Sequence, residues 1–485
     1  MKKTLFITML AAALMGGQVF ADYIPTTTDA PEVDDGFYVG EYSQTADVSR
    51  ANVTINEEEE GGDDFSNSGV YGGFTVGEQT SAINNSVTMT GGQVYKVEGA
   101  YSVSGSANDN SVMMSGGIVA YYVYSGYTGN GNANGNTIEM TGGVAAGVQC
   151  GTARVGNAND NVVIFSGGTL EEIDGGVSFD QGEASGNRVV MSDGTVTGYV
   201  FSGYAANGNA NGNTIEMTGG VAAGVECGET DDGNANDNVV VVSGGTTEEI
   251  YGGVSHNQGE ASGNKVYITG TSGEKKTDVY GAYFEGSSTG NDNAVHLVGA
   301  GADITIDGEN YIGHALQLGS VYAATGSTGT GNSTGNSIEI YGTGIAAATL
   351  SSMQMLNFHI ADGVLLSQEA MVSLTSTSDG EGLDLTGVEI GFSAADVQDW
   401  GKYEGQSITL VTAAQAITID AGSLGEVAIK DANGSTVATA TLALGGSDDV
   451  LSLSNIKGAT PVPEPGTGVL GLLALGLLAG RRRKH

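Results

Sequence analysis

The 485-residue chain has a formal net charge of −40 and contains 81 glycines, 5 prolines and 2 cysteines. Such an excess of acid repels phosphate backbones, which excludes nucleic acid as a partner, and the glycines lack the G-X-Y period of collagen. Many short strands joined by Gly and Asn turns suit this composition, so the predicted fold class is all-β.

Residues 1–21 have the parts of a secretory signal peptide: two lysines, an apolar stretch and a V-x-A cleavage site that ends at Ala21. This segment predicts export from the cytoplasm. Residues 22–51, rich in Thr and Asp, are expected to form an N-terminal lead or cap.

Repeat units dominate residues 52–352. The unit at 136–161, NTIEMTGGVAAGVQCGTARVGNANDN, returns almost unchanged at 213–238 as NTIEMTGGVAAGVECGETDDGNANDN. The spacing between units is 25 or 26 residues up to Asn264, and insertions lengthen the last units. Each unit opens with Asn, carries apolar residues two and four positions later, as in Ile138 and Met140, and then reaches Gly-Gly or a variant.

This alternation is typical of a strand with one buried face. One unit buries little apolar surface alone, whereas stacked units share a core. A unit is too short for a propeller blade of about 40 residues, and the strand period and glycine content exclude helical repeats. We therefore predict a parallel β-helix (β-solenoid) of about ten coils.

The recurring asparagines are interpreted as structural. Side-chain amides at equivalent positions of successive coils can hydrogen-bond along the stack, and Asn tolerates the left-handed conformation of a tight corner. The interpretation covers Asn85, Asn110, Asn136, Asn161, Asn187, Asn213, Asn238 and Asn264.

Cys150 and Cys227 occupy the same place in units three apart. Stacking at roughly 4.8 Å separates their Cα atoms by about 14 Å, beyond the limit of about 7 Å for a disulfide. We expect two unpaired thiols that point into the core.

The repeat stops over residues 353–460. Segments 387–392, 407–412 and 437–444 alternate like strands. This region is predicted to be a small C-terminal β domain, or a run of irregular coils, that caps the solenoid and protects its open strand edge.

The tail, residues 461–485, has three parts in order: a Pro-Glu-Pro motif, an apolar run over 466–480 and a basic end. It resembles the PEP-CTERM sorting signal of Gram-negative bacteria. The resemblance implies recognition by an exosortase-type enzyme, transient anchoring in the inner membrane and delivery to the cell surface or outer envelope. A plain C-terminal membrane anchor is the alternative. The motif residues are Pro463, Glu464, Pro465, Arg481, Arg482 and Arg483.

Catalytic patterns are weak. Acidic residues at equivalent positions, such as Glu172 and Glu249, are three units apart, or about 14 Å, wider than the roughly 5–9.5 Å of glycosidase carboxylates. The histidines lack metal-ligand spacing. Two GNANDN loops offer Asp160 and Asp237 as candidate calcium ligands, although sister loops have Gly instead. We expect no enzyme and no cofactor other than this calcium.

Outward positions of the first strand are apolar in two units, at Val162 with Ile164 and at Val239 with Val241. They predict either a face for self-association or a surface that a neighbouring loop covers.

The repeats resemble the passenger regions of autotransporter adhesins over about residues 52–350. With the sorting tail, this favours a non-enzymatic structural or adhesive surface protein, a stalk or scaffold in the envelope or extracellular polymer layer. Its expected partners are sorting machinery and extracellular polysaccharide or host surface glycans, which a repetitive surface can bind multivalently. The alternative is a polysaccharide-processing lyase or glycosidase on a β-helix.

Overall fold

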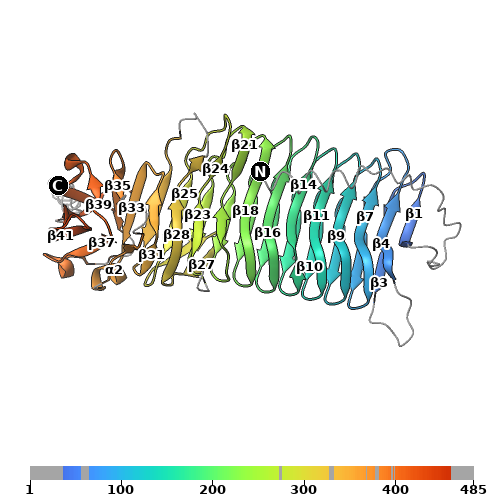
Figure 1. Cartoon of the computed structure of the whole chain (residues 1–485), viewed down its shortest axis with the longest axis horizontal. Helices are drawn as coiled ribbons and strands as arrows, with labels where there is room; N and C mark the ends of the chain where they lie inside the picture. Colours follow the sequence, from blue (N-terminus) through green and yellow to red (C-terminus); the bar gives the residue numbers. More distant parts are fainter. Residues whose placement is uncertain are drawn as a thin grey trace, which may run out of the picture.

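The structure is a computed structural model that describes residues 37–55, 65–271, 276–326, 333–367, 369–376, 382–394, 397 and 399–459. It is a parallel β-solenoid of about 11 turns, which confirms the predicted fold class (Figure 1). Thr137 pairs with Val162, and Val162 pairs with Arg188, in parallel register. One repeat unit is therefore one coil.

Sheet 1 is the stack of short strands that begin just after the repeating asparagines. Its inward side chains are the apolar pairs of the repeat, such as Ile138 and Met140, and all ten pairs are buried in one continuous core. The strands are β3 (Asn52–Ile55), β6 (Ser86–Met89), β8 (Ser111–Met114), β10 (Thr137–Met140), β12 (Val162–Phe165), β15 (Arg188–Met191), β17 (Thr214–Met217), β19 (Val239–Val242), β22 (Lys265–Ile268), β25 (Ala294–Val298), β30 (Ser337–Tyr341), β33 (Met355–Ile360) and β36 (Glu389–Ala394).

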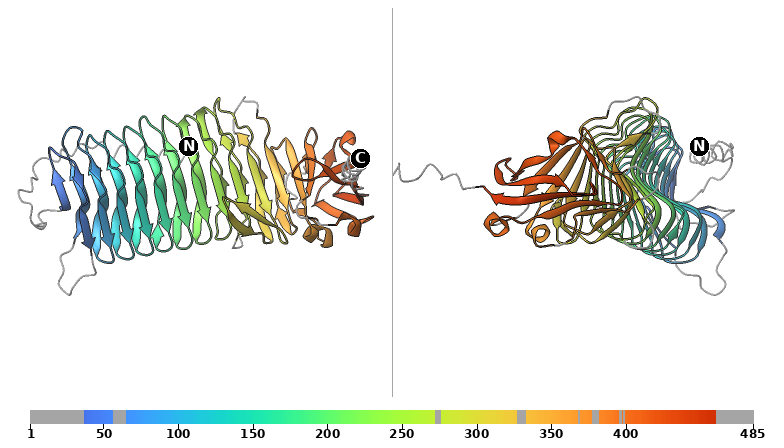
Figure 2. Two further views of the ribbon diagram at one scale, coloured as in Figure 1. Left: turned by 180° about the vertical axis from the view of Figure 1, so that it is seen from behind. Right: turned by 60° about the vertical axis from the view of Figure 1, so that its left-hand side comes forward.

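Sheet 2 is the facing stack, and most of its strands are longer than the alternation in the sequence predicts. Strands bend where they pass a pair of small residues, so the outline of the coils is bent and not round (Figure 2, right). The strands are β1 (Phe37–Ser43), β4 (Phe65–Thr75), β7 (Gln93–Ser102), β9 (Ile118–Thr128), β11 (Val144–Ala153), β13 (Thr169–Leu170), β14 (Glu172–Ser178), β16 (Thr195–Ala205), β18 (Val221–Asp232), β20 (Glu249–Tyr251), β21 (Val254–Gln258), β23 (Thr277–Tyr280), β24 (Tyr283–Phe284), β28 (Leu316–Tyr322), β29 (Thr325–Gly326) and β32 (Thr349–Ser351).

A third side, here called the Asn side, closes each coil with an extended segment such as residues 156–160. The amide of Ala133 donates to the carbonyl of Asn157 in the next coil. The amide of Asn157 donates to the side-chain Oδ1 of Asn132, at 3.0 Å. Alternate amides of the segment thus use a backbone and a side-chain acceptor, which explains why the loops are rich in Asn.

The asparagines that open the units form a buried Asn ladder at the corner before sheet 1. In each step the backbone amide of one Asn donates to the Oδ1 of the Asn in the next coil, as from Asn136 to Asn161 at 2.9 Å. The side-chain Nδ2 of Asn136 donates to the same oxygen at 3.0 Å. The ladder starts at Ala51, whose amide donates to Asn85, and ends where Asn336 donates to Gln354.

The stack extends beyond both predicted boundaries. β1 already pairs with β4, so sheet 2 begins at Phe37 and not at residue 52. At the other end β33 and β36 continue sheet 1 past residue 352. These strands lack the Asn-x-apolar-x-apolar pattern, because Gln354 replaces the ladder Asn there.

Antiparallel pairing appears only after this point in the described core, between β39 (Gly425–Lys430), β40 (Thr436–Leu444) and β41 (Val450–Gly458). β41 also pairs antiparallel with β37 (Ile408–Ala413). The smaller elements of the chain are β2 (Val48–Ser49), β5 (Ala82–Ile83), β26 (Asp303–Ile306), β27 (Glu309–Ile312), β31 (Ile345–Ala347), β34 (Val372–Leu374), β35 (Asp384–Leu385), β38 (Thr418–Ile419), α2 (Asp362–Leu366), η1 (Trp400–Tyr403) and η2 (Ala421–Ser423).

Candidate functional site

The bend of sheet 2 places side chains from both halves of a strand on one concave surface. In β14 the bend lies at Gly175 and Gly176. A Cβ atom on Gly175 would lie 2.3 Å from the carbonyl oxygen of Ser202, and one on Gly176 would lie 2.6 Å from the Nδ2 of the ladder residue Asn187. Only glycine allows this close approach. The Asn ladder therefore supports the bend from behind.

A row of large or polar side chains follows the bend from coil to coil. Its members alternate with core residues such as Val148 and Ile173, so they point away from the core, yet nearly all are buried against one another. The row is Tyr71, Glu98, Tyr124, Gln149, Asp174, Phe201, Glu226 and Tyr251.

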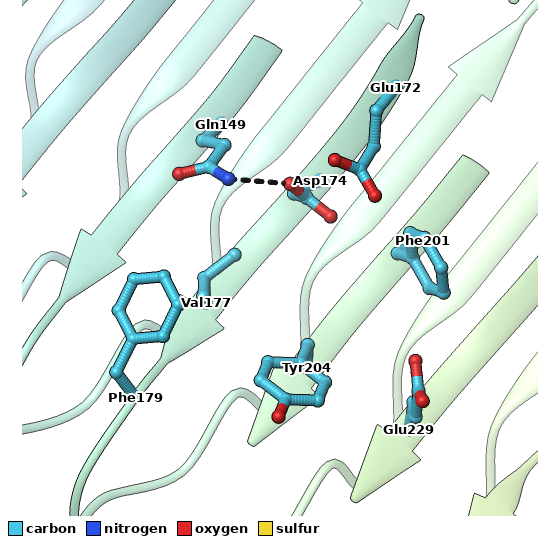
Figure 3. Close-up of a pocket in the computed structure, with 8 residues that line it drawn as sticks. All are labelled: Gln149, Glu172, Asp174, Val177, Phe179, Phe201, Tyr204 and Glu229. Carbon is cyan, nitrogen blue, oxygen red and sulfur yellow. Dashed lines mark hydrogen bonds between the residues drawn. The ribbon is translucent and has the colours of Figure 1, made fainter. Parts of the chain in front are cut away.

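A hollow of about 390 Å³, open to solvent, interrupts this row over β11, β14, β16 and β18 (Figure 3). We call it the central hollow. It combines aromatic and acidic side chains, and its lining is Gln149, Glu172, Asp174, Val177, Phe179, Phe201, Tyr204 and Glu229.

Three carboxylates face the central hollow, and each has one oxygen held by a neighbour. Gln149 donates to Oδ2 of Asp174 at 2.9 Å, as Figure 3 shows. The hydroxyl of Tyr122 donates to Oε2 of Glu172 at 3.1 Å. The second oxygens, Oδ1 of Asp174 and Oε1 of Glu172, have no hydrogen-bond partner among the described residues, although Asp174 is only 5% exposed.

The third carboxylate, Glu229, is paired with a histidine. Nε2 of His256 lies 2.9 Å from Oε1 of Glu229, and Nδ1 lies 3.4 Å from Oε2 of Glu285. Burial alone would lower the pKa of His256, but its hydrogen bond to Glu229 and the charges of Glu229 and Glu226 raise it to about 9. The imidazole is therefore protonated at neutral pH.

Burial sets the protonation of the other two acids. It raises the pKa of Asp174 well above its usual range, and the charges of Glu172 and Glu229 raise it further. Burial also raises the pKa of Glu172, with smaller contributions from the charges of Glu229 and Glu171. Neither acid has a cationic side chain on it among the described contacts, so the hollow holds acid without a matching base.

Tyrosine stacks continue along sheet 2 on both sides of the central hollow. On the N-terminal side the rings of Tyr101 and Tyr127 stack at 5.3 Å. On the C-terminal side Tyr280 stacks on Tyr251 at 4.6 Å and on Tyr322 at 5.0 Å. Their ring faces are occupied by each other, so these stacks stiffen the surface.

Another buried acid lies in the same row, nearer the N-terminus. Glu98 is 2% exposed, and the Nζ of Lys96 contacts its Oε1 at 2.7 Å. Its Oε2 has no hydrogen-bond partner in the described structure. Burial raises the pKa of Glu98, and the charge of Lys96 opposes this shift.

The eight asparagines assigned from the sequence all lie in the Asn ladder, fully buried. The residue before each ladder Asn has a positive φ, at Asp160 (57°) and Asp237 (56°) as at Gly135 (67°) and Gly212 (63°). Left-handed backbone, which Gly, Asn and Asp tolerate best, thus accounts for the alternation of GNANDN with GNANGN.

This geometry offers no support for calcium at Asp160 or Asp237. The two lie in coils three apart, and in the part of the chain that the structure describes no group of three or more His, Cys, Asp or Glu side chains could hold a metal ion.

Both cysteines are buried and unpaired, as predicted from their spacing. Val148, two residues before Cys150, connects by successive parallel pairings to Ile173, Val200 and Val225, so three coils separate the thiols.

The outward apolar positions of sheet 1 differ between coils. Ile164 is 37% exposed, whereas Val241 is 3% exposed. The hairpin of β26 and β27 lies over the strand beside Val241, since the hydroxyl of Tyr311 donates to Glu216, the neighbour of Val241 in the next strand. The hairpin thus covers one end of this face, in line with the interpretation that a loop covers it.

Sequence reasoning missed a hydroxyl–imidazole–carboxylate chain on the outer face of sheet 1. Oγ of Ser393 lies 2.7 Å from Nδ1 of His359, and Nε2 of His359 lies 2.8 Å from Oε2 of Glu339. The three residues occupy adjacent strands β36, β33 and β30 in register. Such an order of groups can activate a hydroxyl nucleophile.

It also missed the central hollow, because Glu229 is brought to Glu172 and Asp174 only by the pairing of Val177 with Tyr204 and of Tyr204 with Glu229. The available signal was an acid at outward positions of neighbouring coils, but the bulge between Val196 and Tyr199 shifts the count from 25 to 27 residues there.

Comparison with known proteins identifies the tail alone. The predicted signal peptide, the sorting residues and the apolar run lie outside the described residues, and among the described residues no helix is both long and apolar enough to cross a membrane. No curated protein and no solved structure matches the chain. Residues 461–484 match the family described as PEP-CTERM protein-sorting motif. The chain therefore carries a PEP-CTERM sorting signal, which implies an exported protein that exosortase-type machinery sorts.

Proposed function

We propose that the chain is a non-enzymatic structural protein of the cell surface, a stiff rod that contacts extracellular polysaccharide along its side. The observation that carries this proposal is the unbroken Asn ladder from Ala51 to Gln354, which links every coil to the next by buried hydrogen bonds. A buried amide ladder costs free energy when any member is lost, because its neighbours keep unsatisfied polar groups. A sequence that preserves it over the whole stack favours mechanical continuity.

The sorting tail and the acidic composition support a surface location. A net charge of −40 keeps such a rod soluble and separate from its copies in a crowded layer. The proposal also includes an adhesive role, since contacts repeated along a rod add up even when each is weak.

Display can be tested with the full chain in its native host. We expect intact cells to expose the rod to added protease, and replacement of Pro463, Glu464 and Pro465 by Ala to remove that exposure. The control replaces Pro461 by Ala, just outside the Pro-Glu-Pro motif. Equal exposure of the motif variant and the unchanged protein would contradict sorted display.

A second candidate is glycoside hydrolysis in the central hollow. It is favoured by one observation, a pair of acids with raised pKa values, Asp174 and Glu172, beside the carboxylate of Glu229. Glycosidases use a protonated acid and an ionised carboxylate in this way.

A further inference from the structure

The central hollow presents acceptor oxygens without donors. Oε1 of Glu172, Oδ1 of Asp174 and Oε2 of Glu229 have no hydrogen-bond partner among the described residues. Asp174 and Glu229 are 5% and 6% exposed, so these oxygens are neither well hydrated nor paired. Buried carboxylate oxygens are costly unless a donor reaches them, preferably a charged one.

The remaining walls suit a cation. Phe179, Phe201 and Tyr204 surround the acids, and aromatic faces attract ammonium groups. A uronic acid polymer would instead meet three carboxylates and only one cationic side chain, His256, whose Nε2 is already used by Glu229. The lining therefore selects against acidic polysaccharides and for ligands that carry N–H donors and positive charge.

The spacing of the acids matches an extended polymer. Glu172 and Asp174 are in β14, whereas Glu229 is in β18, two coils further along the axis. Two strand spacings amount to roughly 9.6 Å. An extended chain of pyranose rings with a two-fold twist presents the same face at every second ring, which is an advance of similar length.

We infer that the central hollow binds a linear amino-sugar polysaccharide. The ammonium group of one sugar lies at Glu172 and Asp174, and that of the second sugar along lies at Glu229. An ammonium supplies three donors, so one group satisfies both Oε1 of Glu172 and Oδ1 of Asp174. This inference rests on the proposed function, because it names the polysaccharide that the rod contacts.

The test uses the purified full chain and calorimetric titration with hexamers of glucosamine, N-acetylglucosamine and galacturonic acid. The first two differ only in the acetyl group that removes the charge. We expect the glucosamine hexamer to bind at least about tenfold more tightly than either of the others. Glu172→Gln with Asp174→Asn, and Glu229→Gln separately, should each weaken it by about tenfold or more.

The matched control is Glu171→Gln, which removes an exposed charge next to Glu172 and should leave binding unchanged. Equal loss in this control would show general attraction and overturn the site. Equal binding of the acetylated hexamer, tighter binding of galacturonate, or equally tight binding of a lysine hexamer would overturn the amino-sugar assignment. Failure here with normal surface display would overturn the inference and leave the proposed function standing.

Discussion

Asp109 and Gly135 lie one above the other in successive coils: a Cβ atom on Gly135 would lie 2.5 Å from Oδ1 of Asp109. The same relation joins Asp160 to Gly186 and Asp237 to Gly263. Each of these aspartates is thus followed by a glycine in the next coil. The acids that looked like calcium ligands belong to a steric pattern of the stack.

This relation predicts different costs for two similar substitutions. Gly135→Ala and Gly212→Ala both place a side chain at positive φ, but among the described residues a Cβ on Gly212 meets nothing within 4 Å. We expect Gly212→Ala to cost about 1 kcal/mol. Gly135→Ala should cost about 1 kcal/mol more, because Asp109 must leave its rotamer.

Denaturant unfolding midpoints of the two variants measure the difference. Asp109→Gly in the Gly135→Ala background should remove the extra cost, which a double-mutant cycle isolates. Equal midpoints for the two alanine variants would refute the steric account.

The Asn ladder predicts a large loss of stability for a single amide. Asn161→Ala removes the acceptor for both the backbone amide and the Nδ2 of Asn136. Two buried donors then lack a partner, and the free energy of unfolding should fall by about 3 kcal/mol. Asn159→Ala in the same coil removes one acceptor at a partly exposed position, and about 1 kcal/mol is expected. A smaller effect at Asn161 than at Asn159 would show that the ladder does not hold the stack.

Asp174 predicts an unusual dependence of stability on pH. Burial raises its pKa in the folded chain, so between the unfolded and folded pKa values the folded state binds more protons. Stability from this group is therefore full below about pH 4 and is lost as pH rises through the folded pKa. Asp174→Asn should be more stable than the unchanged protein at pH 7 and similar at acidic pH.

Thermal unfolding at a series of pH values checks this sign. Glu171→Gln, which removes an exposed charge nearby, serves as the control and should leave the pH dependence unchanged. Lower stability of Asp174→Asn at pH 7 would mean that the carboxylate is paired in a way the structure does not contain.

The thiols should be inert in the folded chain. Burial raises the pKa values of Cys150 and Cys227, and the thiolate is the reactive form. A thiol reagent should label neither cysteine under native conditions and both after unfolding. Rapid labelling of the native chain, or a disulfide between the two, would contradict the three-coil separation.

The repeat made the fold predictable because its signals are local. An apolar pair such as Ile138 and Met140 specifies a strand face, and the Asn before it specifies a corner, in every unit. The bend in sheet 2 was harder to predict, since Gly175 and Gly176 show their role only against Ser202 and Asn187 in the next coil.

The central hollow depends on relations between coils of unequal length. Asp174 to Phe201 spans 27 residues, whereas Gln149 to Asp174 spans 25. A search for acids at a fixed period pairs Glu172 with Glu249, three coils away, and overlooks Glu229. For the same reason the histidines looked scattered, although His359 contacts both Glu339 and Ser393.

The central claim is that the rod contacts polysaccharide without transforming it. The most direct measurement incubates the purified full chain with a panel of polysaccharides and follows binding together with reducing ends and unsaturated products. The account predicts binding and no turnover, in the unchanged protein and in Asp174→Asn and Ser393→Ala variants. Turnover that either substitution abolishes would contradict it and establish an enzyme at that residue.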